Sequence, residues 1–436
     1  MHVTRLHATN FRCFPEVKVD LQPGFNLLIG DNQSGKTAVL DALTIALSCY
    51  FQGFSTGVSQ GIEKDDARLA MQKLGETVQM PAQYPVQVTC TAQLATTESG
   101  LTSWARQRKD ARSRTGRAWT DLGRHGAALD EKMRQGEAVD LPVLACFGTE
   151  RVSKERQTHP TSYGSTRDRS LGYKDCLERA SNLRLIRDWV AQQTLAEAQK
   201  RERGIPSTAG AQLRAIEKAV CRCVPDIKQF FYDLEYKDLA VVFTDQRRLP
   251  WSMLSDGVHS LATMAMDLAW RAAVLNPHHG EAAPERATGV VLVDEIDLAL
   301  HPKWQIDVIN NLMAAFPALQ FVATTHSPLV LAGAESARVL QLAGGEVYPL
   351  QHVYGQDSNT VLRDYMEGPT RAAQMQQRLD AIADLIDQEQ LAAAQQSIED
   401  LEAQLGPSST DLVRLRTTLE FLRPPQAAAT TDPEPK

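Results

Sequence analysis

Residues 30–37 read Gly30-Asp31-Asn32-Gln33-Ser34-Gly35-Lys36-Thr37. They lie between an apolar run at 25–29, typical of a buried strand, and a segment with helical spacing at 38–47. The pattern G-x-x-x-x-G-K-S/T in this context predicts a phosphate-binding loop, because backbone N–H groups and the helix N-terminus point at the phosphates. Lys36 would place its charge on the β and γ groups, and Thr37 would offer its hydroxyl to Mg²⁺. A chance glycine-rich turn is the alternative, and the flanking strand and helix argue against it.

A second apolar run, at 290–293, ends in two adjacent acids, Asp294 and Glu295. A buried strand here would place Asp294 beside Thr37 to hold Mg²⁺, and would leave Glu295 free to polarise the attacking water. Alone, the run fits equally well a strand followed by a solvated acidic turn. The phosphate-binding loop in the same chain favours the metal-binding and catalytic pair.

The composition narrows the class of protein. With 436 residues, the chain has room for two to three domains or for one large domain with insertions. A net charge of −7 makes it no general polyanion binder, so any nucleic-acid contact needs a local basic patch. The sequence has no apolar run of about 18 residues, no signal-peptide core and no CxxC pair, which predicts a reduced cytoplasmic protein without a membrane span or structural metal.

The periodicity of apolar residues predicts the order of the main elements. Strands are expected at 3–9, 17–21, 25–29, 84–94, 141–147, 230–236, 239–243, 290–293 and 321–323, and helices at 38–47, 177–200, 211–224 and 261–274. Residues 155–169 are polar and are expected to be mobile.

Two further motifs lie near the paired acids. Leu254-Ser255-Asp256-Gly257 precedes a predicted helix, and the strand at 321–323 runs into Thr324-Thr325-His326. Each motif is ordinary alone, and an isolated histidine such as His326 is more often structural. In this order and spacing they resemble the signature motif and the H-loop of ABC-type ATPases.

The resemblance spans about residues 1–365 and is strongest to the non-transporter ABC heads, the SMC, RecF and OLD-like group. It also rests on Asn10-Phe11-Arg12-Cys13-Phe14, Leu40-Asp41-Ala42-Leu43 and Leu300-His301-Pro302. It implies an α/β head with a mixed sheet, an antiparallel N-terminal subdomain and a long helical insertion at about 50–250.

The same resemblance implies ATP and Mg²⁺ as ligands. Glu295, Lys36 and His326 would be catalytic, and the phosphate loop would bind the nucleotide together with three further residues, Arg12, Ser255 and Gly257. Ser255 would act on the nucleotide of a second copy of the chain, in an ATP-sandwich homodimer. The sequence departs from the family where Gln33 and Asp256 replace glycines. The segment 141–147, followed by Gly148-Thr149-Glu150-Arg151, stands where a Q-loop is expected but contains no glutamine, so the residue that senses the γ-phosphate stays open.

The C-terminal part resembles the PtuA ATPases of Septu and retron anti-phage systems, which accompany an HNH nuclease, PtuB. The resemblance rests on residues 353–359 and on the helices that run to Leu422. We expect a helical oligomerisation or partner-binding region at 366–423 and a disordered tail at 424–436. The apolar faces of its three helices would pack on the head or form an interaction surface, and we favour the second. They include Leu379, Ile386, Leu401 and Leu419.

The segment 106–134 is rich in arginine, with two tryptophans nearby. Exposed arginines and aromatic rings suit contact with single-stranded DNA or RNA, whereas a solvated hairpin face is the competing interpretation. The residues concerned are Arg106, Arg108, Lys109, Arg112, Arg114, Arg117, Arg124, Trp104 and Trp119.

Two functions fit these patterns. The first is the ATPase subunit of an anti-phage defence complex, which forms nucleotide-sandwich dimers and higher oligomers that hold and regulate a separate HNH nuclease. The second is a RecF-like DNA-binding ATPase in repair. A transporter subunit is disfavoured because about 220 residues separate Lys36 from Ser255. An ATPase with its own nuclease is disfavoured because the region after His326 is short and mostly helical.

Overall fold

The computed structural model describes residues 1–54, 59–74, 77–94, 100–116, 119–152, 168–180, 182–205, 207–406 and 409–422. The chain divides into two compact units, Met1–Val361 and Leu362–Lys436. The segment expected to be mobile, 155–169, lies almost entirely outside the described residues, as does the tail 424–436.

The central sheet of the first unit has six described strands in the order β15-β14-β3-β13-β12-β8. Neighbouring strands run parallel, except that β15 is antiparallel to β14. Four of them (β3, β8, β12 and β13) are buried along their whole length, as their continuous apolar sequence predicts. The six strands are β3 (Phe25–Ile29), β8 (Val143–Phe147), β12 (Gly289–Val293), β13 (Leu319–Thr324), β14 (Ala337–Ala343) and β15 (Glu346–Leu350).

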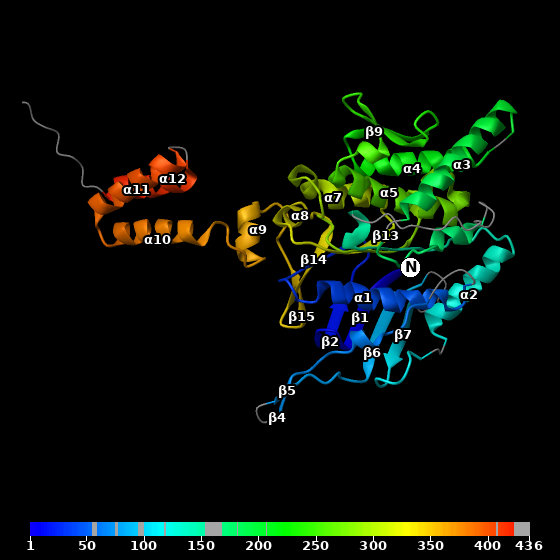
Figure 1. Ribbon diagram of the computed structural model, residues 1–436, viewed down its shortest axis with the longest axis horizontal. Helices are drawn as coiled ribbons and strands as arrows, with labels where there is room; N and C mark the ends of the chain where they lie inside the picture. Colours follow the sequence, from blue (N-terminus) through cyan, green and yellow to red (C-terminus); the bar gives the residue numbers. More distant parts are fainter. Residues whose placement is uncertain are drawn as a thin grey trace, which may run out of the picture. The chain divides into compact units, whose positions relative to one another are not determined.

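A second sheet is antiparallel, with the order β2-β1-β6-β7. Helix α1 (Lys36–Leu47) packs between this sheet and the central sheet (Figure 1). Its strands are β1 (His2–Phe11), β2 (Phe14–Asp20), β6 (Val86–Gln93) and β7 (Leu101–Arg108). Both β6 and β7, and also β8 of the central sheet, come from the segment 50–250 that the sequence analysis treated as an insertion. Part of that segment therefore completes the two sheets of the head.

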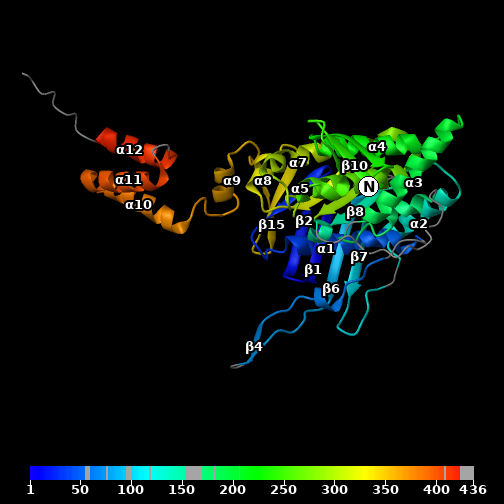
Figure 2. The ribbon, with the colours of Figure 1, turned by 45° about the horizontal axis from the view of Figure 1, so that its top comes forward.

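The helical layer on the other side of the central sheet is built around α5 (Asp256–Leu275), which packs on α4 (Ala209–Cys223) and on β8 (Figure 2). The predicted helices at 211–224 and 261–274 are confirmed as α4 (Ala209–Cys223) and α5. The helix expected at 177–200 begins only at Leu183, as α3 (Leu183–Glu202). The preceding residues are not helical because their carbonyls bond to β8: Cys146 N donates to Cys176 O at 2.8 Å, and Gly148 N donates to Arg179 O at 3.1 Å.

A three-stranded sheet and several short elements complete the first unit. The predicted strand pair is confirmed as β9 (Ile227–Asp233) and β10 (Asp238–Phe243), with β11 (Arg248–Pro250) on the edge. No helix among the described residues is both long and apolar enough to cross a membrane. The remaining elements are α1 (Lys36–Leu47), α2 (Asp121–Arg134), α6 (Ala283–Arg286), α7 (Pro302–Ala315), α8 (Pro328–Ala332), α9 (Ser358–Asp364, which ends in the second unit), β4 (Gln72–Leu74) and β5 (Thr77–Gln79).

In its described residues, the second unit contains the end of α9 and three complete helices, α10 (Ala373–Asp387), α11 (Leu391–Leu405) and α12 (Thr410–Leu422). Their apolar faces pack against one another and form a small core of their own. These apolar faces are therefore not themselves the interaction surface that we favoured, because each helix is covered by the other two. A role of this unit in oligomerisation or partner binding stays a prediction. The core consists of Leu379, Ile382, Ile386, Ala394, Ile398, Leu401, Leu412 and Leu419.

Candidate functional site

The phosphate-loop sequence connects β3 to α1, and two of its glycines are required by the backbone. Gly30 has φ of +147° and Gly35 has φ of +99°, a region that favours glycine. A Cβ on Gly30 would lie 2.4 Å from Leu342 O, and one on Gly35 would lie 2.2 Å from the ring of Phe14. The loop therefore keeps a shape that a larger residue at either position would disrupt.

Lys36 is buried at the start of α1, and only 7% of its surface is exposed. Its ammonium donates to Gly30 O at 2.6 Å and to Asp31 O at 2.9 Å, so it closes the loop upon itself. Burial lowers the pKa of Lys36, although three nearby carboxylates oppose the shift. Ser34 Oγ is also buried and has no hydrogen-bond partner among the described residues. A cation and an unpaired hydroxyl in one backbone cradle fit a phosphate group.

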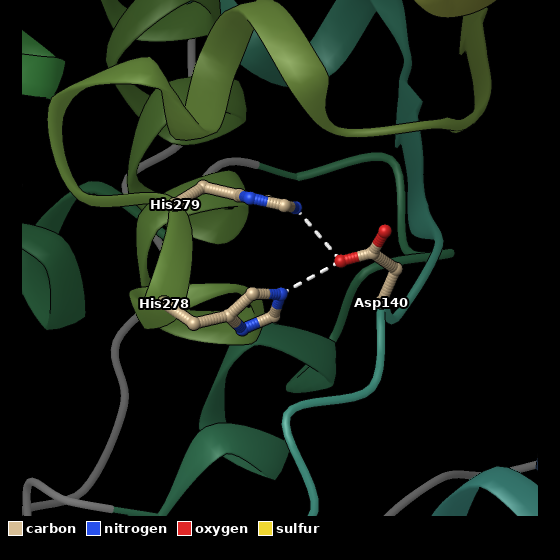
Figure 3. Close-up of side chains that lie close together, drawn as sticks. All are labelled: Asp140, His278 and His279. Carbon is tan, nitrogen blue, oxygen red and sulfur yellow. Dashed lines mark hydrogen bonds and ion pairs between the residues drawn. The ribbon is translucent and has the colours of Figure 1, made fainter.

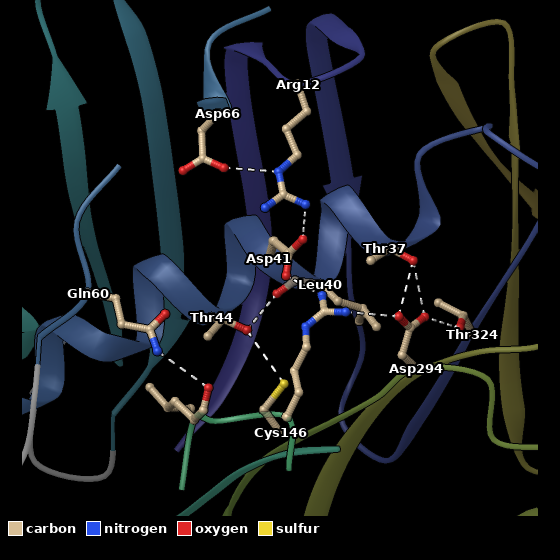
Figure 4. Close-up of polar contacts among 12 residues, drawn as sticks. Arg12, Thr37, Leu40, Asp41, Thr44, Gln60, Asp66, Cys146, Asp294 and Thr324 are labelled. Atoms are coloured by element: carbon tan, nitrogen blue, oxygen red, sulfur yellow. Dashed lines mark hydrogen bonds and ion pairs between the residues drawn. The ribbon is translucent and has the colours of Figure 1, made fainter. Parts of the chain in front are cut away.

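Asp294 follows β12 and receives three side-chain donors from different elements (Figure 4). Thr37 Oγ1 donates to its Oδ2 at 3.1 Å, which confirms the predicted proximity of these two residues. Thr324 Oγ1 donates to Oδ1 at 2.8 Å, and Arg179 Nη1 donates to Oδ2 at 3.2 Å. A carboxylate beside a hydroxyl is a donor set that suits Mg²⁺.

Glu295 has a left-handed backbone, with φ of +51°, which is uncommon for a residue with a side chain. Its N–H donates to Thr324 Oγ1 at 2.7 Å, so one threonine hydroxyl connects the backbone of Glu295 with the carboxylate of Asp294. These bonds hold the turn after β12 in a conformation that it would not keep alone.

Arg151 lies in the segment where a Q-loop was expected, and its guanidinium is buried. It donates to Gly148 O at 3.0 Å, to Asp294 O at 2.6 Å and to Ser260 Oγ in α5 at 3.3 Å, and also to Glu295 O. Burial lowers the pKa of Arg151 to about 10, which leaves it cationic at neutral pH. Arg151 thus joins the end of β8, the acidic turn and α5.

Arg12 lies in a network of ion pairs beside the phosphate loop (Figure 4). Its Nε donates to Asp66 at 3.0 Å and its Nη1 donates to Asp41, which also accepts from Arg179. Arg12, Asp41 and Arg179 line a pocket of about 810 Å³. The structure therefore links Arg12 to Asp294 through a chain of alternating charges.

Among the described residues, no hydrogen bond joins Ser255, Gly257 or His326 to the phosphate loop. Ser255 is exposed and precedes the first residue of α5, and its side chain does not cap that helix. Gly257 is buried, and a Cβ there would lie 2.5 Å from Ala299 O. His326 is exposed just beyond β13. Within the loop itself, Asn32 and Gln33 are exposed, and Gln33 has φ of +71° where the family has glycine.

Comparison with known proteins supports this arrangement. A family model described as an AAA domain matches residues 5–220, and one described as "AAA domain, putative AbiEii toxin, Type IV TA system" matches residues 195–332. The solved structure of an SmcHead bound to the C-winged helix domain of ScpA aligns with a TM-score of 0.50 and 12% identity, over 80% of this chain and 98% of that chain. This likeness shows the fold.

The names of two relatives indicate the class of activity. The chain is 22% identical to the Retron Ec83 probable ATPase of Escherichia coli, over 96% of this chain and 87% of that protein. A shorter segment is 38% identical to the Septu protein PtuA of Bacillus mycoides (strain KBAB4), over 21% of this chain and 12% of that protein. The chain is therefore an ATPase with an SMC head-like fold. It is related to the ATPases of retron and Septu systems.

The arginine-rich segment of this ATPase divides into buried and exposed cations: Arg106 and Arg108 are buried, whereas Lys109, Arg112, Arg114 and Arg124 are exposed. Arg106 and Arg108 are buried on the inner face of β7, and they donate to Gln60 O at 2.8 Å and Ile62 O at 3.0 Å. Trp104, also buried, donates to Ala46 O at 2.9 Å. Contact with a nucleic acid is therefore excluded for these three side chains, and contact through the exposed cations stays a prediction. Arg117 lies outside the described residues. The alternation of 104, 106 and 108 along a strand was the signal that could have shown this.

Sequence reasoning also missed three side chains that hold the ATPase site together. These are Arg151, Arg179 and Thr324. Arg151 was part of a quoted motif without a role, and Thr324 was adjacent to the predicted H-loop. Arg179 has no local pattern around it, because its partners lie 138 residues before it and 115 residues after it.

Proposed function

We propose that this chain binds ATP with Mg²⁺ at the phosphate loop and hydrolyses it, as the ATPase subunit of an anti-phage defence complex. The observation that carries the site assignment is the contact of the Thr37 hydroxyl with Asp294, directly beside the buried ammonium of Lys36. In this proposal Lys36 leaves its two loop carbonyls and binds the β and γ phosphates. Mg²⁺, when bound by Thr37 and Asp294, neutralises charge that develops on the phosphate oxygens.

Hydrolysis in this proposal needs a base and an intact acidic turn. Glu295 accepts a proton from the water whose oxygen bonds to the γ-phosphorus, while the bond between that phosphorus and the bridging oxygen breaks and ADP leaves with the electron pair. His326 would contact the γ-phosphate from the end of β13. Arg151 and Thr324 fix the backbone from which both acids project.

We also propose that the active form is a nucleotide-sandwich homodimer, in which Ser255 reaches the γ-phosphate held by the second copy. The supporting observation is that Ser255 stands exposed before a helix of 20 residues, with its hydroxyl unused as a cap. Unsatisfied N–H groups and the helix dipole make such a helix start attractive to an anion.

The defence role rests on the similarity to the Retron Ec83 probable ATPase, which extends over 96% of this chain. We propose that the complex contains a separate HNH-type nuclease and higher oligomers of this chain, and that it works in the cytoplasm. Direct nucleic-acid binding, as in the RecF-like alternative, has less support because Arg106 and Arg108 are buried.

The site is tested with Lys36→Ala, which removes the ammonium from the cradle. Mg²⁺-dependent ATP binding, measured by calorimetry on the full chain, should be lost. Lys18→Ala, which removes an exposed lysine paired with Glu16 at 2.7 Å, is the control and should bind ATP like the wild type. Unchanged ATP affinity in Lys36→Ala would exclude the assigned site.

The dimer is tested by mixing two inactive chains, Lys36→Ala and Ser255→Arg. A mixed dimer pairs the intact loop of one chain with the intact Ser255 of the other, so part of the ATPase activity should return. No recovery, with mixed dimers shown to form, would mean that Ser255 does not act across the interface.

A further inference from the structure

Three side chains outside the nucleotide site converge on one point (Figure 3). His278 Nε2 and His279 Nε2 each lie 2.7 Å from the same oxygen, Oδ1 of Asp140. The two imidazole rings have centroids 4.2 Å apart, and Figure 3 shows that both are directed at the carboxylate of Asp140. One carboxylate oxygen is therefore shared by two imidazoles that are adjacent in sequence.

The surrounding backbone holds these residues in place. The histidines lie on a short 3-10 helix, Pro277–Ala282, directly after α5, and Asp140 precedes β8. Asn276 is buried and exchanges two hydrogen bonds with the backbone of Leu141, at 2.8 and 3.0 Å. Arg169 donates to Val139 O and, at 2.7 Å, to Leu275 O. The two segments that carry the cluster are therefore joined independently of the cluster itself.

We propose that Asp140, His278 and His279 form a binding site for a transition-metal dication, with Zn²⁺ as the best fit. All three ligand atoms lie within 4.8 Å of one another. Two imidazole nitrogens and one carboxylate oxygen are a donor set used by Zn²⁺, with a fourth position left for water. Mg²⁺ and Ca²⁺ prefer oxygen donors and suit it poorly.

The cluster can open to the size of a metal site with small movements. Zn²⁺ bonds to nitrogen or oxygen at about 2.0–2.2 Å, which separates tetrahedral ligand atoms by roughly 3.4 Å. The present 2.7 Å contacts must therefore lengthen. The Asp140 side chain, 66% exposed, is free to make that movement, whereas His279 is only 13% exposed. The positive charge of Arg169, which bonds to Leu275 O and Val139 O beside the cluster, opposes any dication equally.

A metal here would bridge two elements of the ATPase core. It would join the 3-10 helix that follows α5, whose first turn follows Ser255, to the segment leading into β8, which pairs with β12. We therefore expect the metal to stabilise the head without entering the nucleotide site. This inference reverses the expectation of a chain without a structural metal, and it does not depend on the proposed ATPase mechanism.

The test uses the full chain, purified without a histidine tag and treated with a chelator. Calorimetry with Zn²⁺ should give one site per chain, and Co²⁺ should give visible absorption bands of a nitrogen- and oxygen-bound ion that Zn²⁺ displaces. Thiolate absorption would instead identify binding to a cysteine, of which Cys13 is exposed, and would overturn the proposal. The midpoint of thermal unfolding should rise on adding Zn²⁺ and should not rise with equal Mg²⁺.

Three conservative variants remove one ligand each: Asp140→Asn, His278→Gln and His279→Gln. Each should weaken Zn²⁺ binding at least tenfold, while circular dichroism in chelator matches the wild type. His7→Gln is the control, because His7 pairs with a single carboxylate, Glu16, at 2.9 Å, and should keep wild-type Zn²⁺ affinity. Equal Zn²⁺ affinity in all four variants, or no saturable binding by the wild type, would show that the three side chains only form hydrogen bonds with one another and bind no metal. Mg²⁺-ATP binding is measured alongside, so failure of the metal site and failure of the ATPase site are distinguished.

Discussion

Replacing Arg179 by glutamine should increase the affinity of the nucleotide-loaded head for Mg²⁺. In the structure, Arg179 donates to Asp294 at 3.2 Å and also pairs with Asp41. The Asp294 side chain is only 8% exposed, so this guanidinium is a cation at the place where the proposed Mg²⁺ must bind. Binding of the metal then requires Arg179 to withdraw from Asp294.

The size of the effect follows from the geometry. Two unit charges 3.2 Å apart attract with about 5 kcal/mol at an effective dielectric constant of ~20. Desolvation offsets most of this attraction, because both groups leave water to form the pair. A remainder of about 1–2 kcal/mol corresponds to a roughly 5- to 30-fold lower Mg²⁺ concentration at half-saturation.

The assay is a Mg²⁺ titration of a fluorescent ATP analogue on the full chain, with Glu295→Gln in the background to prevent turnover. Arg5→Gln is the control: Arg5 forms an exposed ion pair with Asp20 and has no bond to Asp41 or Asp294, so its Mg²⁺ half-saturation should stay within about twofold of the parent. A half-saturation that is unchanged or higher in Arg179→Gln would refute the competition between Arg179 and Mg²⁺.

Three other predictions follow from single features of the structure. Glu295→Gln should leave ATP binding intact and slow hydrolysis by about 10²- to 10⁴-fold, because the amide keeps the shape and loses the base; wild-type turnover would assign the base elsewhere. Gly257→Ala should lower the midpoint of thermal unfolding and the ATPase rate together, because the added Cβ meets Ala299 O at 2.5 Å; Ser252→Ala, at an exposed position, is the control. Truncation before Gly368 should preserve ATP binding, because the second unit has its own core, and should reduce higher assembly or partner association. Unchanged assembly, measured by light scattering, would contradict a role of the second unit in assembly.

Local sequence was sufficient wherever one contiguous segment makes the structure. The glycines at 30 and 35 predict the phosphate loop because their backbone conformations are open to few other residues. The apolar runs of β3 and β12 predict buried parallel strands because such strands are covered on both faces. These two facts together predicted the contact of Thr37 with Asp294, although 257 residues separate them.

Tertiary structure alone decided which side chains complete the site and which faces are covered. Arg179 reaches Asp294 across 115 residues, and Asp140 meets His278 across 138, without any spacing that periodicity detects. Likewise, an amphipathic helix carries the same pattern whether its apolar face packs on a neighbour or stays open, so only the structure showed that α10, α11 and α12 cover one another. The physical reason is common to these cases: a hydrogen bond or a packed face depends on distance in space, whereas a sequence motif records only distance along the chain.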